Sequence, residues 1–241
     1  MIPLPPSAAD LRWAEWLSRL LGHWQFFDQG VESAIRHNVL GGLWFAASLF
    51  QLWSRGGEES TERYRRVLMA VLASAIAIGL VLGVHAATLR TPPNRNPALA
   101  HLYPSYLMDN PNQNCFPSMS SALYGSIAAV AMAASRLWGT LLWVALLVLV
   151  ALPRMYLGGH YTTDVLAGIA LGLAGCVLAR RFDRRYGEAL GTRLARLRRW
   201  RPAFAFVVFL WIWQVAVEFR DADWLQRSLR LAVSTYMTSR R

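Results

Sequence analysis

Apolar residues gather in stretches that approach the ~20 residues a helix needs to cross a bilayer. The predicted spans cover about residues 37–54, 67–89, 118–134, 137–153, 161–179 and 202–219. Little more than Ser135 and Arg136 separates the third span from the fourth, so these two spans form a tight helical hairpin. The pattern therefore predicts an all-α, polytopic membrane bundle of about six transmembrane helices.

Both ends of the chain carry a weaker, amphipathic pattern. Residues 8–26 repeat apolar positions at helical spacing between charged ones, which predicts one amphipathic helix lying in the membrane interface. Residues 220–241 look similar. We therefore divide the chain into an interfacial N-terminal segment (1–36), a six-span membrane domain (37–219) and an amphipathic tail (220–241).

A long polar segment, residues 90–117, interrupts the apolar pattern between the second and third spans. It contains six prolines and no apolar run. Long loops in compact domains are usually functional or disordered. Together with the turn between the fourth and fifth spans, it defines two expected active-site loops, 90–120 and 154–164.

Composition and charge support a membrane location. The 241 residues are 55% hydrophobic and only 16% charged, whereas soluble proteins carry about a quarter charged residues. All 25 basic residues are arginine, which excludes any mechanism that needs a lysine. Residues 55–66 hold four arginines and residues 180–201 hold nine, so both segments are predicted to be cytoplasmic. The two active-site loops, and both termini, then lie on the opposite side.

The net charge of +11 is therefore attributed to arginines near anionic headgroups, and no nucleic-acid partner is expected. The two cysteines, Cys115 and Cys176, offer neither metal spacing nor a disulfide framework. We expect no metal and no cofactor. The sequence leaves the oligomeric state open.

The sharpest chemical pattern lies between the fourth and fifth spans. Asp164 follows His160 by one helical turn on the same face. A carboxylate there can accept a hydrogen bond from one imidazole nitrogen, leaving the other nitrogen free as a nucleophile. Arg154 offers a planar fork suited to phosphate oxygens. In the alternative interpretation, His160 and Asp164 only cap the helix and Arg154 marks the membrane boundary.

Two weaker clusters precede it. Ser118 is a predicted N-cap of the third span, and the free N–H groups there, with Ser120 in the first turn, can bind an anion. Arg90 and Arg95 can clamp a phosphate. Each cluster also has a plain structural interpretation, as a helix cap and as anchors for lipid headgroups.

In this order the clusters resemble the type 2 phosphatidic acid phosphatase (PAP2) superfamily. Its pattern is a lysine followed by Arg-Pro, then Pro-Ser-Gly-His, then Ser-Arg, five residues, His, three residues and Asp. The resemblance covers about residues 88–175. It implies a PAP2-like core in which His160 takes the phosphoryl group, Asp164 orients it and Arg154 holds phosphate oxygens, all at the outer membrane surface.

The chain departs from that pattern in several places. Ser120 stands where the family has a histidine that protonates the leaving group, Arg90 replaces the lysine, and Pro153 replaces the serine before the third-motif arginine. Arg95 lies two positions before the place of the arginine in the first family motif, where this chain has Pro97. A general acid typically increases the reaction rate by ~10²–10⁴-fold. A diphosphate needs the acid less than a monoester, because the phosphate that leaves is a weaker base than an alkoxide. His101, in the same loop, is an alternative acid.

The favoured function is a lipid phosphatase that hydrolyses a lipid phosphate or diphosphate, such as a polyprenyl diphosphate carrier, through a phosphohistidine. We expect it in a bacterial inner membrane with its active site facing the exterior. Two alternatives remain: a phosphotransferase that uses the same histidine, and a non-catalytic protein that binds a lipid phosphate. A transporter is disfavoured because the spans lack intramembrane charges for ion coupling.

Overall fold

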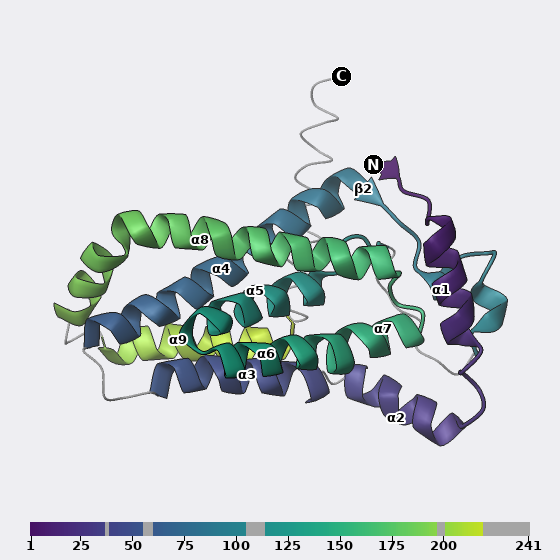
Figure 1. Ribbon diagram of the computed structural model, residues 1–241, viewed down its shortest axis with the longest axis horizontal. Coiled ribbons are helices and arrows are strands. Elements are labelled where there is room, and N and C mark those ends of the chain that lie inside the picture. Colours follow the sequence, from purple (N-terminus) through teal and green to yellow (C-terminus); the bar gives the residue numbers. More distant parts are fainter. Residues whose placement is uncertain (37–38, 55–59, 105–113, 197–200, 219–241) are drawn as a thin grey trace.

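Most of the chain forms a bundle of helices that run along its long axis (Figure 1). The computed structural model describes residues 1–36, 39–54, 60–104, 114–196 and 201–218. The bundle consists of α3 (Val39–Ser54), α4 (Ser60–Ala87), α5 (Met119–Ala134), α6 (Arg136–Ala145), α8 (Thr162–Arg196) and α9 (Arg201–Ala216). The predicted tail 220–241 lies outside the described residues.

Three helical stretches in the described part of the chain are long and apolar enough to cross a membrane. They are Arg65–Ala87, Arg136–Tyr156 and Thr162–Arg193, while Met119–Ala134 and Ala205–Ala216 are shorter apolar helices. The predicted helical, membrane-integral character is therefore confirmed. The tight hairpin is also confirmed, because Ser135 ends α5 and caps α6.

The fourth predicted span ends later than expected. After α6 the helix widens into a π-helical segment, Leu146–Ala151, and continues as α7 (Leu152–Tyr156). Arg154 therefore sits in the last helical turn and not in a loop. Such π-helical segments occur often near functional sites.

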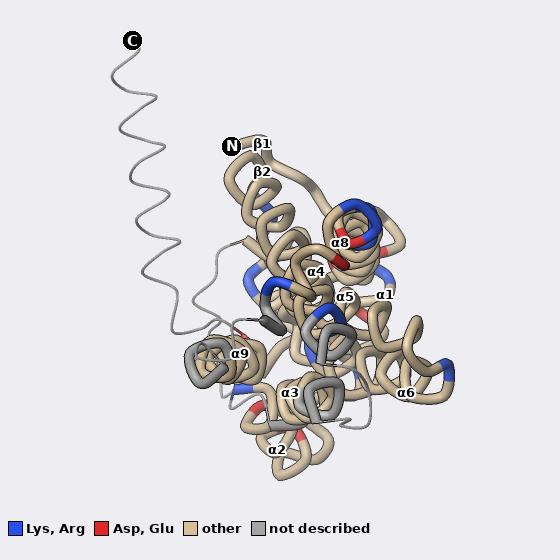
Figure 2. The backbone as a smooth tube through the Cα atoms, turned by 90° about the vertical axis from the view of Figure 1, so that its left-hand side faces the viewer, with Lys and Arg blue, Asp and Glu red and all other residues tan. Residues whose placement is uncertain are grey.

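The fifth span is much longer than predicted. Helix α8 continues beyond the predicted end of the span at residue 179, through the arginine-rich segment. Arginine, alanine and leucine favour helices, and the next proline is Pro202. Arg65 of α4 donates two 2.8 Å hydrogen bonds to Asp183 on this extension. Figure 2 shows arginines gathered at this end of the bundle.

The single helix predicted over 8–26 is wrong. Helix α1 (Ala8–Ser18) ends early, a turn containing Gly22 at φ +80° follows, and α2 (Gln25–Arg36) begins. Before α1, β1 (Ile2–Pro3) pairs in parallel with β2 (Thr88–Leu89). The sequence analysis missed this short ladder. It fastens the N-terminus beside the polar loop, at the end of the bundle where α1 and α2 lie (Figure 1).

Glycines let α8 pack closely on its neighbours. A Cβ on Gly168 would lie 2.3 Å from the Ser118 carbonyl oxygen, and one on Gly172 would lie 2.5 Å from that of Ala122. Gly175 approaches α4 in the same way. These contacts hold the start of α8 directly against the start of α5.

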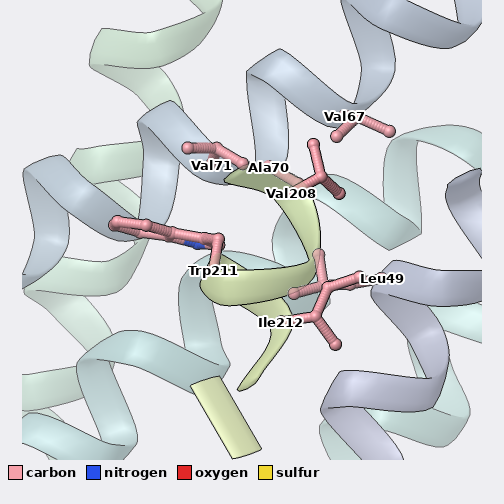
Figure 3. A pocket seen from close by; sticks show the side chains of 7 residues that line it. All are labelled: Leu49, Val67, Ala70, Val71, Val208, Trp211 and Ile212. Atoms are coloured by element: carbon pink, nitrogen blue, oxygen red, sulfur yellow. The ribbon is translucent and has the colours of Figure 1, made fainter. Parts of the chain in front are cut away.

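Helix α9 packs on α3 and α4 through an apolar seam (Figure 3). Its lining side chains are Leu49, Val67, Ala70, Val71, Val208, Trp211 and Ile212. The space left between them is about 10 Å³, which is room for no more than a water molecule. The seam is therefore a packing contact and not a ligand site.

Candidate active site

The two active-site loops meet at the end of the bundle that carries α1. The backbone N–H of Asn94 donates to the Gly158 carbonyl at 3.0 Å, and that of Ser118 donates to the Asp164 carbonyl at 3.0 Å. Gly158 has φ +71°, and a Cβ there would strike the ring of Tyr103. The polar loop, the start of α5 and the turn before α8 therefore lie side by side. The alternation of spans predicted that the two active-site loops would meet in this way.

His160 lies just before α8 with a defined tautomer. Its Nδ1 is 2.9 Å from the Cys115 carbonyl oxygen. A carbonyl can only accept, so Nδ1 carries the hydrogen and Nε2 keeps its lone pair. The side chain is 12% exposed, and burial together with the charge of Arg154 lowers the pKa of His160 to about 3. The imidazole is therefore neutral and nucleophilic at physiological pH.

Asp164 does not make the hydrogen bond that the sequence suggested. Its Oδ2 lies 3.9 Å from His160 Nδ1, too far for a hydrogen bond, because the Cys115 carbonyl already occupies that nitrogen. Asp164 instead accepts from the Tyr161 N–H at 2.7 Å and from Arg90 Nη1 at 2.5 Å. Its carboxylate therefore lies near the imidazole without a hydrogen bond to it.

Arg90 is enclosed and not open to solvent. Its side chain is 5% exposed, and its Nη2 donates to Asp10 at 2.7 Å. Its Nη1 also donates to Thr163 Oγ1 at 2.6 Å, and its Cζ lies 4.7 Å from the centre of the Tyr161 ring. Burial opposes its charge, but Asp164 and Asp10 together raise the pKa of Arg90. Both terminal nitrogens are thus engaged by protein groups, which leaves them unavailable to phosphate in this conformation.

Arg154 is the more accessible of the two arginines. Its Nη2 donates to both carboxylate oxygens of Glu218, at 2.6 and 2.5 Å, and the two side chains are 17% and 10% exposed. Sequence reasoning missed Glu218, whose only signal was a carboxylate at the end of the sixth span. It occupies the guanidinium that we expected to hold phosphate.

The second cluster opens helix α5. Ser118 is the N-cap, as predicted, and its Oγ accepts from the Ser121 N–H at 3.5 Å and from the Ser121 hydroxyl at 3.0 Å. Ser120 lies in the first turn and is 5% exposed. Beside them, His85 Nε2 lies 3.0 Å from the Pro117 carbonyl oxygen. The sequence analysis missed His85 because it falls inside an apolar span.

The two remaining candidates lie in the polar loop. Arg95 ends one 3₁₀ turn (Pro93–Arg95), and His101 lies exposed in the next (Ala100–Leu102). Between them, Asn96 donates to the Tyr161 hydroxyl at 2.8 Å, which ties this part of the loop to the site. The roles of Arg95 as a phosphate ligand and His101 as an acid stay predictions. In the described ranges, no three His, Cys, Asp or Glu side chains gather as a metal site.

Comparisons with known proteins identify the family of the chain. The sequence profile of the PAP2 superfamily matches residues 63–188, which contain all three motifs. The chain is 29% identical over 146 residues, 60% of its length and 70% of the other's, to the Escherichia coli (strain K12) protein named "Putative undecaprenyl-diphosphatase YbjG". No solved structure gives a significant match. Since the profile spans more than half of the chain, this protein belongs to the PAP2 superfamily.

Proposed function

We propose that this protein hydrolyses a polyprenyl diphosphate, with His160 as the nucleophile. The observation that carries the proposal is the state of the His160 ring: Nδ1 is held by a carbonyl, and Nε2 is left with its lone pair. The E. coli relative, whose name describes it as an undecaprenyl-diphosphatase, supports a diphosphate lipid as the substrate class.

In the first step, the Nε2 lone pair attacks the terminal phosphorus, and the bond from that phosphorus to the bridging oxygen breaks. The bridging oxygen keeps the electron pair and leaves on the lipid monophosphate. In the second step, water attacks the phosphorus of the phosphohistidine and the P–N bond breaks. Inorganic phosphate and a proton are released, and Nε2 regains its lone pair.

Two groups can stabilise the charge of the transferring phosphoryl group. Arg154 supplies a guanidinium once Glu218 moves aside, and the N-terminus of α5 supplies oriented N–H groups. Ser120 cannot replace a protonating histidine, so a leaving group of low basicity is favoured. The site should therefore cleave a diphosphate faster than a monophosphate.

We also propose the complete membrane arrangement. The shorter apolar helices α3, α5 and α9 cross the bilayer beside the three long ones, which makes six spans. The arginine-rich end of α8 faces the cytoplasm, and the His160 end faces the exterior of a bacterial inner membrane. The distribution of arginines supports this orientation (Figure 2).

The test is phosphate release by detergent-purified protein without added metal, comparing a C55 prenyl diphosphate with its monophosphate. We expect release that favours the diphosphate and is lost in His160→Ala. Persistent release by that variant would remove His160 as the nucleophile. Turnover that appears only after an acceptor lipid is added would replace hydrolysis with phosphoryl transfer. Lipid binding without turnover would leave a binding protein.

A further inference from the structure

Asp10, on α1, belongs to the neighbourhood of His160 although it lies far outside the matched region 63–188. Its side chain is 1% exposed. It accepts hydrogen bonds from the Thr163 N–H at 3.1 Å, the Thr163 hydroxyl at 2.8 Å and Arg90 Nη2 at 2.7 Å. Ser7 donates two more. Asp10 thus joins the N-terminal segment to the first turn of α8.

The charges in this cluster do not balance. Asp10 and Asp164, which is fully buried, share one guanidinium, that of Arg90. Burial opposes ionisation of Asp10, but hydrogen bonds from Thr163 and Ser7 hold its pKa below the usual value. With both carboxylates ionised, the cluster carries a net charge of −1 in a buried place, where a charge acts strongly on its neighbours.

The neighbour that gains positive charge is His160. When Nε2 takes a phosphoryl group, the ring becomes an imidazolium, because Nδ1 keeps its hydrogen. A carboxylate oxygen, Asp164 Oδ2, lies 3.9 Å from that Nδ1. If Arg90 were paired with Asp164 alone, the pair would be neutral and would offer the imidazolium little.

We propose that Asp10 is an electrostatic positioning residue for the reaction. It shares the charge of Arg90 and so leaves Asp164 a net negative charge to stabilise the phosphorylated ring of His160. The inference rests on the proposed function. It assigns the N-terminal segment to the catalytic unit and not only to the membrane interface.

The experiment varies the charge of the cluster in the full-length protein. Asp10→Asn brings it to zero, Arg90→Gln brings it to −2, and the double variant returns it to −1. We expect Asp10→Asn to lower kcat for a prenyl diphosphate roughly tenfold to a hundredfold, with little change in KM. The double variant should recover most of that loss.

Ser7→Ala is the matched control, because it removes a hydrogen bond to Asp10 without changing the charge. It should keep kcat within a few-fold of wild type. A role limited to capping α8 makes the opposite prediction: the double variant, having lost more contacts, would be slower than Asp10→Asn. That result, or an unchanged kcat in Asp10→Asn, would overturn the proposal.

Binding of orthovanadate provides a readout that does not depend on turnover, since vanadate mimics the five-coordinate state of phosphoryl transfer. Vanadate binding at the site should be lost in His160→Ala. It should weaken in Asp10→Asn and recover in the double variant. A further outcome is a vanadate affinity that follows the cluster charge across the variants while the wild type cleaves no prenyl diphosphate. In that case the proposed substrate fails and the role of Asp10 stands. Vanadate affinity that ignores the cluster charge would overturn the role of Asp10, and so would a wild type that neither binds vanadate nor turns over.

Discussion

Two arginines near the same histidine have opposite surroundings. Arg90 is 5% exposed, and three hydrogen bonds join its terminal nitrogens to Asp10, Thr163 and Asp164. Arg154 is 17% exposed, and it forms an ion pair with Glu218. Two of the partners of Arg90, Asp10 and Asp164, are themselves buried, and Asp10 also accepts hydrogen bonds from Thr163. Arg154 is instead bound by a carboxylate that reaches water.

The difference separates a structural cation from an exchangeable one. Removing Arg90 from its site would leave two buried carboxylates without a counter-charge, which is strongly unfavourable. Exchanging Glu218 for a phosphate replaces one anion by another on a partly exposed guanidinium. Of Arg90 and Arg154, we therefore propose Arg154 as the phosphate ligand, and the role of Arg95 stays a prediction.

The largest expected effect is on stability. Arg90→Gln should lower the free energy of unfolding by about 3–5 kcal/mol, because Asp10 and Asp164 would then face each other unpaired. Thermal unfolding in detergent measures this, with Arg154→Gln as the control. Adding Asp10→Asn to Arg90→Gln should restore part of the loss. Equal destabilisation by the two arginine variants would contradict the comparison.

The next effect is on activity. Arg154→Gln should lower kcat/KM for a prenyl diphosphate by about 10²–10³-fold while changing the unfolding midpoint little, because it removes the guanidinium that we propose as the phosphate ligand. Steady-state phosphate release measures it. A variant that keeps wild-type kcat/KM would show that Arg154 is an anchor and not a ligand.

A pH effect tests whether burial lowers the pKa of His160 in the folded protein. The pKa of His160 is about 3 in the folded protein and about 6.5 in an unfolded chain, so below pH 6.5 the unfolded state binds a proton that the folded state does not. The contribution of His160 to stability should therefore fall by up to about 2 kcal/mol between pH 7 and 5. Asp10, with its lowered pKa, contributes its own loss only below about pH 4. His160→Gln should flatten the dependence of the unfolding free energy on pH between 7 and 5. An unchanged dependence would mean that other groups cause it.

The smallest effect concerns Glu218. Glu218→Gln should strengthen inhibition by inorganic phosphate up to about fivefold, because a partly exposed ion pair contributes about 1 kcal/mol or less and the variant no longer competes for Arg154. The inhibition constant measures it. Weaker inhibition would mean that Glu218 orients Arg154 for phosphate and does not block it.

Parts of this protein could be predicted from the sequence because their causes are local. The apolar stretches, the cap at Ser118 and the hairpin at Ser135 follow from hydrophobicity and capping chemistry within a few residues. The spacing of Arg154, His160 and Asp164 indicated the family that the profile match then showed. The boundaries were less accurate where a helix continues without a local stop, as in α8.

The sequence by itself determined which long apolar stretches form helices, that Arg154, His160 and Asp164 form one motif, and that the two polar loops lie at the same end of the bundle. Only the tertiary structure decided which partner each charge takes. Asp10 and Arg90 are 80 residues apart, and Arg154 and Glu218 are 64 apart. No local pattern encodes such pairs, because a buried charge selects whichever counter-charge the packing of distant helices brings within reach.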